Sequence, residues 1–220
     1  MLSALNCEHQ KKTYITAYEP VDIVTIFNVF CRPEYLVRPT DTLILDIGAN
    51  IGAFTTYAAI MAPNATIISY EPVDYVYERL SQQCKQGPFA ARITPVNAAV
   101  GKNDEYRKIF SGDNDAVSTL YTQPGFPPGA EVKVLSIHSI LESIEGRVSL
   151  LKMDCEGAEW DILDALTAES VRDIDRLCLE YHLIGGRDWR QLLERVQGWG
   201  FVLEKHVSFR ETGTAWFERY

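Results

Sequence analysis

The sequence predicts a doubly wound α/β fold, in which a mostly parallel sheet carries helices on both faces. Two observations lead to this prediction. Short, largely apolar runs recur along the chain and are typical of buried strands, and segments with the apolar spacing of an amphipathic helix lie between several of them. Strands that alternate with helices are joined by right-handed crossovers and therefore run parallel. The strand-like runs are 43–47, 66–70, 93–96, 148–153 and 177–181.

The helical segments carry apolar residues at i, i+3, i+4 and i+7, starting at Ile23, Phe54, Val73 and Trp189. The first of these helices should end near Pro33, because proline cannot continue a helix. A chain of 220 residues is within the size of one compact domain. We therefore expect a helical extension over 1–40, followed by one domain over 41–220.

Two segments break the alternation of strands and helices. The runs 201–205 and 215–219 are both strand-like and are joined through a short polar stretch with Gly213, which predicts a C-terminal antiparallel hairpin. Residues 101–131 are rich in Gly, Pro, Asp and Asn and show no sustained period. This segment is expected to be a loop-rich insertion, with short strands at 106–110 and 116–120.

Composition and charge narrow the class of protein. The net charge is −9, with 21 basic and 30 acidic side chains, whereas nucleic-acid affinity depends on Lys and Arg. The five cysteines are scattered without a C-x-x-C pair, as is typical of reduced intracellular thiols. No apolar run approaches the roughly 18 residues of a membrane-spanning helix. We expect a soluble, cytoplasmic protein with neither a membrane nor a nucleic-acid partner.

The first candidate site follows the strand at 43–47. Gly48 and Gly52 allow a tight turn, close approach of the backbone to a ligand, and a helix start that faces the same crevice. Asp46 would repel a pyrophosphate, and Asn50 replaces a glycine of the dinucleotide-binding motif. A carboxylate here suits a cationic ligand. The methionyl ammonium of S-adenosylmethionine is such a group, bound by Asp46 directly or through a water molecule.

A second carboxylate fits the same ligand. Glu71 stands nineteen residues after Gly52 and directly follows the strand at 66–70. In nucleoside-binding folds, an acidic residue at this place accepts hydrogen bonds from both ribose hydroxyls. An ordinary strand-to-helix turn and a solvated carboxylate would explain each feature singly. Their combination favours a nucleoside cofactor.

Further polar residues follow the next two strands, where they should face the same crevice. Methylation of a hydroxyl requires removal of its proton, so these side chains are candidate general bases. The candidate catalytic residues are Asp154, Glu156, Glu180 and His182.

Other roles are open for the same cluster. Asp154, Glu180 and His182 are also candidate ligands of a divalent cation, which would orient and acidify the hydroxyl. Asp154 would alternatively cap the helix that follows it, and Glu159 would complement the dipole of that helix.

Five motifs resemble the FkbM family of S-adenosylmethionine-dependent methyltransferases: DIGANIGAF at 46–54, YEP at 70–72, NAAVG at 97–101, LLKMDCEGAEWDIL at 150–163 and LEYH at 179–182. The resemblance implies a class I methyltransferase sheet. It also implies an acceptor hydroxyl on a sugar or a polyketide-like natural product. The cofactor-binding residues that it implies are Asp46, Gly48, Ala49, Asn50, Gly52, Glu71 and, near the adenine, Asn97.

Three alternatives stay open at this stage. A nicotinamide-dependent oxidoreductase shares the crevice and the acidic ribose ligand, but it favours glycine where Asn50 stands. A regulatory protein would bind the cofactor without turnover, and its acidic residues would have no need to converge in space. An RNA methyltransferase would require a local basic patch.

Overall fold

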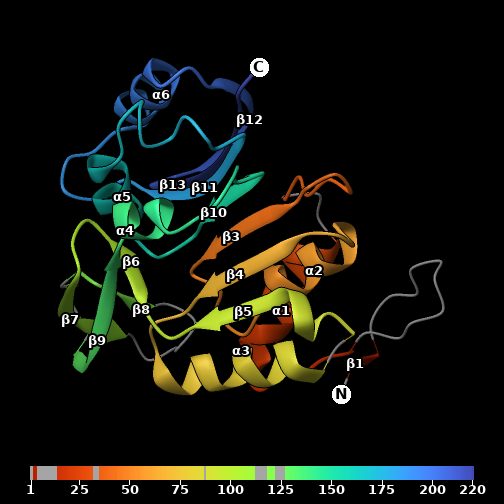
Figure 1. Cartoon of the computed structure of the whole chain (residues 1–220). Coiled ribbons are helices and arrows are strands. Elements are labelled where there is room, and N and C mark those ends of the chain that lie inside the picture. Colours follow the sequence, from red (N-terminus) through yellow and green to blue (C-terminus); the bar gives the residue numbers. More distant parts are fainter. Residues whose placement is uncertain (1, 4–13, 32–34, 87, 112–117, 122–126) are drawn as a thin grey trace.

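A seven-stranded sheet forms the centre of the computed structural model, which describes residues 2–3, 14–31, 35–86, 88–111, 118–121 and 127–220 (Figure 1). Its strand order is β12-β13-β11-β10-β3-β4-β5. The last five strands of that order are parallel to one another. The bounds are β3 (Leu43–Ile47), β4 (Thr66–Tyr70), β5 (Ile93–Val96), β10 (Leu150–Met153), β11 (Arg176–His182), β12 (Val202–Phe209) and β13 (Thr212–Glu218). The expected mostly parallel α/β sheet is confirmed.

The helices cover both faces of this sheet. Helices α1 and α2 contribute to the core on one face, whereas α4, α5 and α6 contribute to the core on the other. Helix α3 packs beside β5 at one edge (Figure 1). The bounds are α1 (Pro20–Cys31), α2 (Ala53–Met61), α3 (Asp74–Gln86), α4 (Ile137–Glu142), α5 (Glu159–Ala165) and α6 (Trp189–Gly198), and a short 3-10 helix spans Ala90–Arg92.

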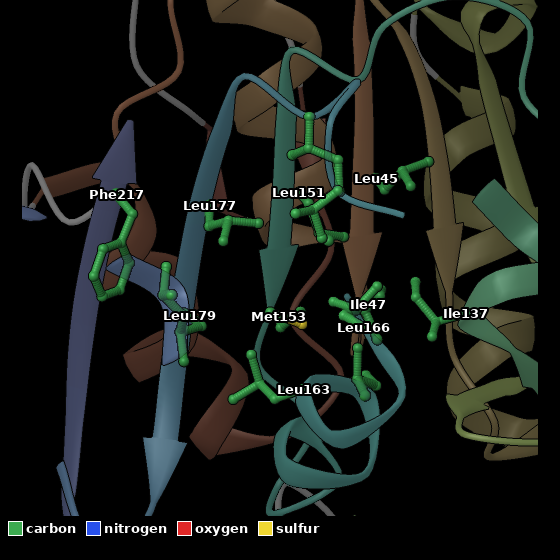
Figure 2. Packing of buried hydrophobic residues seen from close by; sticks show 14 of the residues in the cluster. Leu45, Ile47, Ile137, Leu151, Met153, Leu163, Leu166, Leu177, Leu179 and Phe217 are labelled. Atoms are coloured by element: carbon green, nitrogen blue, oxygen red, sulfur yellow. The ribbon is translucent and has the colours of Figure 1, made fainter. Parts of the chain in front are cut away.

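The two cores follow from the alternation of side chains along each strand. In β3, Leu45 and Ile47 enter the core beneath α5, whereas Ile44 enters the core beneath α2. Figure 2 shows the first core, in which leucines of neighbouring parallel strands lie side by side and meet the side chains of α5. Because helices cover both faces of the sheet, the sequences of these strands are nearly continuous apolar runs.

The C-terminal hairpin is confirmed, but it is longer than expected. Strand β13 lies antiparallel between β11 and β12, and the turn is at Arg210, which has a φ of 54°. Gly213 lies inside β13 rather than in the turn. A Cβ atom at Gly213 would lie 2.4 Å from the hydroxyl of Tyr181, so the strand needs glycine where it crosses this ring.

A second, four-stranded sheet replaces much of the expected loop-rich insertion. Its strands are β6 (Ala99–Gly101), β7 (Glu105–Ser111), β8 (Ser118–Thr119) and β9 (Pro128–Ser136), in the order β6-β9-β7-β8. The strand expected at 106–110 is confirmed within β7. Of the strand expected at 116–120, residues 118–119 form β8, while 116 and 117 lie outside the described residues. The expectation of a mainly irregular segment was wrong, because β9 pairs with both β6 and β7.

The N-terminal part also contains structure that the sequence did not predict. Strands β1 (Leu2–Ser3) and β2 (Tyr14–Ile15) pair antiparallel. Within the described part of the chain, no helix has the length and apolar character needed to span a membrane.

Candidate active site

A cavity of about 300 Å³ opens at the carboxyl ends of β3, β4, β10 and β11. The loop after β3 forms one wall, the ends of β4 and β6 form a second, and the ends of β10 and β11 form a third. Helix α1 closes a further side through Thr25, Asn28 and Val29. Residues far apart in the sequence thus meet where doubly wound sheets bind ligands.

The loop after β3 is held in one conformation by its own contacts. Gly48 has a φ of 78°, and a Cβ atom there would lie 1.8 Å from the carbonyl oxygen of Asp154. The backbone N–H groups of Gly48 and Ala49 donate to the carbonyl of Tyr70 at 3.1 and 2.9 Å. Asn50 is also left-handed, with a φ of 50°. Glycine therefore lets this loop lie directly against the end of β10.

Glu71 joins the end of β4 to this loop. Its carboxylate accepts hydrogen bonds from the backbone N–H groups of Asn50, at 3.0 Å, and Val73, at 2.9 Å. The side chain is buried and lines the cavity. Burial raises the pKa of Glu71 to about 7, against the opposing effect of the two hydrogen bonds. Each carboxylate oxygen keeps a lone pair with which to accept from a ligand hydroxyl.

Asp46 lies beneath the cavity rather than on its wall. It is fully buried, its Oδ1 atom lies 3.0 Å from Nζ of Lys152, and its Oδ2 atom accepts from the Thr55 hydroxyl at 2.7 Å. Asp46 is thus not among the residues that line the cavity, and its expected role toward a cationic ligand stays a prediction. The cation that balances this carboxylate is Lys152.

Two other expected cofactor residues also lie off the cavity wall. Asn97 is exposed, and its side-chain amide donates to Asp74 at 2.7 Å. Gly52 is the N-cap of α2 and packs against the side chain of Leu80. Of the implied cofactor residues, the cavity is lined by Gly48, Ala49, Asn50 and Glu71.

Lys152 connects the loop after β3, which is expected to bind the cofactor and is called the cofactor loop (48–52), with the acidic wall. The acidic wall is formed by Asp154, Glu156 and Glu180. The ammonium of Lys152 donates to the carbonyl oxygen of Gly48 at 2.8 Å and lies 3.8 Å from Oδ2 of Asp154. Burial lowers the pKa of Lys152, but the carboxylates of Asp46 and Asp154 outweigh burial and raise it above its usual value. Lys152 is therefore a permanent cation at the base of the cavity.

Three of the four expected catalytic residues line the cavity: Asp154, Glu156 and Glu180. Burial raises the pKa of Glu180 to about 8, and the charge of Asp154 adds to this effect. Glu180 is therefore mostly neutral at pH 7, while Asp154 has the ammonium of Lys152 nearby. Two carboxyl groups in such different environments can take different roles in proton transfer.

The fourth expected residue, His182, has another role. Its ring lies between two carboxylates, with Nε2 3.3 Å from Glu156 and Nδ1 3.5 Å from Glu159. Burial lowers the pKa of His182, but these two carboxylates outweigh burial and raise it to about 11. The ring is thus already protonated at neutral pH. These contacts favour His182 as a charged partner of Glu156 over its expected role as a proton acceptor.

Glu159 supports the turn that follows β10. It is fully buried, and its carboxylate accepts from the backbone N–H groups of Cys155, at 2.8 Å, and Gly157, at 2.9 Å. Glu156 occupies the left-handed region in this turn, with a φ of 53°. Glu159 and His182 thus hold a strained turn whose Glu156 side chain faces the cavity.

The expected candidate metal ligands do not form a metal centre. Among the residues that the structure describes, no group of three or more His, Cys, Asp or Glu side chains is placed to hold a metal ion. Of the candidates Asp154, Glu180 and His182, the histidine directs both ring nitrogens toward carboxylates of the protein.

Tyr35 is the functional-site residue that sequence reasoning missed most completely. It lies between α1 and β3, lines the cavity, and donates a hydrogen bond from its hydroxyl to Oδ2 of Asp154 at 3.5 Å. Its ring packs on Phe54 with a centroid distance of 4.8 Å. No local pattern around residue 35 indicates this position, because it depends on how the N-terminal segment folds over the sheet.

Two known proteins of similar sequence are methyltransferases. The chain is 29% identical over 164 residues to Methyltransferase 1 of Beauveria bassiana, with 64% of this chain and 65% of that protein covered. It is 23% identical over 164 residues to the hexuronic acid methyltransferase AglP of Haloferax volcanii, with 71% and 63% covered. The chain thus spans less than two thirds of the length of these relatives.

A solved structure shares the fold. The methyltransferase FkbM from Methylobacillus flagellatus superposes with a TM-score of 0.53 at 17% identity, over 87% of this chain and 47% of that one. The model of the methyltransferase FkbM domain matches residues 46–206, which contain the cofactor loop, Glu71, Lys152 and the acidic wall. The chain therefore belongs to the FkbM methyltransferase family, and its sheet is that of the class I methyltransferases.

Proposed function

We propose that the chain is an S-adenosylmethionine-dependent O-methyltransferase that acts on a hydroxylated small molecule, with Asp154 as the proton acceptor. The observation that carries the proposal is the placement of Asp154 on the cavity wall, 3.8 Å from the ammonium of Lys152. A nearby cation favours the charged carboxylate, and the charged carboxylate is the form that can take a proton.

The cavity has the groups that S-adenosylmethionine requires. Glu71 can accept hydrogen bonds from the two ribose hydroxyls, and the backbone of Gly48 and Ala49 allows close approach of the ligand. Val73, Val76 and Ala99 give apolar surface for the adenine. The carboxylates on the opposite wall complement the positive charge of the ligand. When bound, S-adenosylmethionine supplies an electrophilic methyl group on a positively charged sulfur. The sulfur keeps the electron pair of the S–CH3 bond when that bond breaks.

The carboxyl groups of the acidic wall would have different roles in methyl transfer. Asp154 accepts the proton of the acceptor hydroxyl as the oxygen bonds to the methyl carbon. Glu180, which is mostly neutral at pH 7, can donate a hydrogen bond to a second oxygen of the acceptor. Glu156 is held in place by His182. Positioning of the acceptor by these groups contributes much of the rate.

The proposed acceptor is a sugar-like or natural-product hydroxyl compound. Several carboxyl groups in one small cavity suit a ligand with several hydroxyls, because hydroxyls donate to carboxylates. AglP, to which the chain is 23% identical over 164 residues, is a hexuronic acid methyltransferase. The excess of acidic side chains in the chain favours a small molecule over nucleic acid.

The test begins with cofactor binding. The melting temperature should rise with S-adenosylhomocysteine and stay unchanged with NAD at the same concentration. A ligand at about 100 times its dissociation constant adds about 2.7 kcal/mol, or about 5–10 °C for a protein of this size. The variant Glu71→Ala should lose most of this rise. A rise with NAD alone would overturn the assignment of the cofactor.

Turnover is then measured with methyl-labelled S-adenosylmethionine and a panel of hexuronic acids, neutral sugars and phenols. Transfer of label to an acceptor oxygen is the expected result. Asp154→Asn should keep the affinity for S-adenosylhomocysteine and lower turnover by about 100-fold or more, as is typical for loss of a general base. Full turnover by Asp154→Asn would show that another group takes the proton.

A further inference from the structure

We propose that Tyr35 is a positioning residue of the acceptor site: its hydroxyl, together with the ammonium of Lys152, fixes one oxygen of Asp154 so that the other faces the acceptor. The inference rests on the proposed function and assigns a role to the segment between α1 and β3, which the sequence suggested to be only an extension.

The contacts of Asp154 are one-sided. The hydroxyl of Tyr35 lies 3.5 Å from Oδ2, and the ammonium of Lys152 lies 3.8 Å from the same atom. The backbone N–H of Asp154 donates to the carbonyl of Ile47 at 3.1 Å, which fixes the main chain. Within the described part of the chain, no contact of this kind is found for Oδ1. This oxygen is therefore the one that can meet a substrate hydroxyl.

Tyr35 is itself held firmly. Its ring packs on Phe54 at an interplanar angle of 56°. Its carbonyl oxygen accepts hydrogen bonds from the backbone N–H of Val37 at 3.0 Å and from the hydroxyl of Tyr57 at 3.4 Å. Packing and hydrogen bonds thus set the direction of the phenol before any ligand binds.

The phenol remains a donor over the working pH range. Burial raises the pKa of Tyr35 well above its usual value, and the charge of Asp154 raises it further. A neutral phenol beside a carboxylate has one proton to donate, and the carboxylate is the acceptor within reach. Hydrogen bonds at catalytic groups are often long in ligand-free proteins and shorten in the complex with substrate. The contact at 3.5 Å is consistent with such a site.

A role in positioning has a defined kinetic signature. Tyr35→Phe keeps the ring and removes the donor, so the carboxylate loses one hydrogen bond and samples more orientations. We expect kcat to fall about 10-fold, which corresponds to the loss of one hydrogen bond to a charged group. KM for S-adenosylmethionine should change little.

Tyr57→Phe is the matched control. It removes a phenol hydroxyl from a neighbouring ring that contacts the backbone of Tyr35 but has no contact with Asp154 among those described. This variant should keep the kcat of the wild type. A fall in kcat of the same size in Tyr35→Phe and Tyr57→Phe would overturn the proposal, because a general disturbance of the segment would then explain both.

A double-mutant cycle with Asp154→Asn adds a measurement that needs no acceptor. Tyr35→Phe should lower the melting temperature of the wild type clearly, and that of Asp154→Asn much less, since the amide is a weaker acceptor. Equal losses in both backgrounds would refute the contact. If the effects of the two substitutions on the melting temperature are coupled but no methyl transfer is found, the result counts against the proposed function alone. If methyl transfer is found without such coupling, the role of Tyr35 is overturned.

Discussion

Asp46 and Lys152 stand opposite each other on neighbouring parallel strands and form an ion pair of 3.0 Å, with side chains that are 0% and 3% exposed. The pair lies directly under the cavity. Lys152 also binds the carbonyl of Gly48 and approaches Asp154. A single buried cation thus contacts the strand below the cofactor loop, the loop itself and the proposed base.

Removal of one partner of this pair should destabilise the fold strongly. Lys152→Met leaves the carboxylate of Asp46 buried without a cation, and such losses cost about 3–5 kcal/mol. The double variant Asp46→Asn, Lys152→Met should regain a large part of this stability, because no uncompensated charge remains. Urea denaturation measures both effects. If the loss in the free energy of unfolding of the double variant equalled the sum of the losses of the two single variants, the uncompensated buried charge would not be the cause of the instability.

Gly48→Ala should disrupt the cofactor loop. The new methyl group would lie 1.8 Å from the carbonyl oxygen of Asp154, at a φ of 78°. We expect a loss of about 2–4 kcal/mol in the free energy of unfolding, together with loss of the thermal shift by S-adenosylhomocysteine. Gly146→Ala is the matched control, because Gly146 has a φ of 95° with nothing within 4 Å of the new atom. It should cost only about 1 kcal/mol, and an equal cost at both sites would refute the steric explanation.

Glu180→Gln should stabilise the protein at alkaline pH. The pKa of Glu180 is raised from 4.5 to about 8 in the folded protein, so its contribution to stability is present below pH 4.5 and is lost as the pH rises through 8. The uncharged amide avoids this loss, which we expect to be on the order of 2–3 kcal/mol for a partly exposed side chain. The difference in melting temperature between variant and wild type should grow from pH 5 to pH 9. A constant difference would show that Glu180 ionises normally.

His182 should stay protonated in conditions where ordinary histidines are neutral. The contacts with Glu156 and Glu159 raise its pKa to about 11, so its stabilising contribution is fully present below pH 6.5 and is lost as the pH rises toward 11. In NMR titrations the ring of His182 should remain protonated between pH 6 and pH 9. Those of His206 should titrate below pH 6.5, because burial lowers its pKa. Titration of His182 near neutrality would contradict the proposed pair with Glu156.

The sequence predicted those parts of the fold that depend on local pattern. The strands at 43–47, 66–70 and 93–96 have the expected bounds, because each is a compact apolar run between turn residues. Strand β9 was missed. Its first half is exposed and begins with Pro128 and Gly129, so that only Val132, Val134 and Ser136 show the alternation of a half-buried strand.

The sequence predicted cavity-lining residues that directly follow strand ends, such as Glu71 and Asp154. Pairing across strands was not predictable. The partner of Lys152 follows only from the strand register that sets it beside Asp46. Likewise, His182 is suited to be a base by residue type, and only its two carboxylate neighbours show that it is already charged. Tyr35 depends on packing between distant segments, which leaves no periodic signal in the sequence.

The contacts of Lys152 bear on any attempt to change the acceptor of the proposed methyl transfer. Changes at the ends of β10 and β11 would alter the ammonium's surroundings and with them the loop that carries Gly48, so affinity for the methyl donor and choice of acceptor would vary together. Helix α1 offers a separate route. Thr25 and Asn28 line the cavity from outside the sheet, with no bond to Lys152 among their described contacts. Libraries for altered selectivity should therefore diversify α1 and leave the buried cation and its four oxygen neighbours intact.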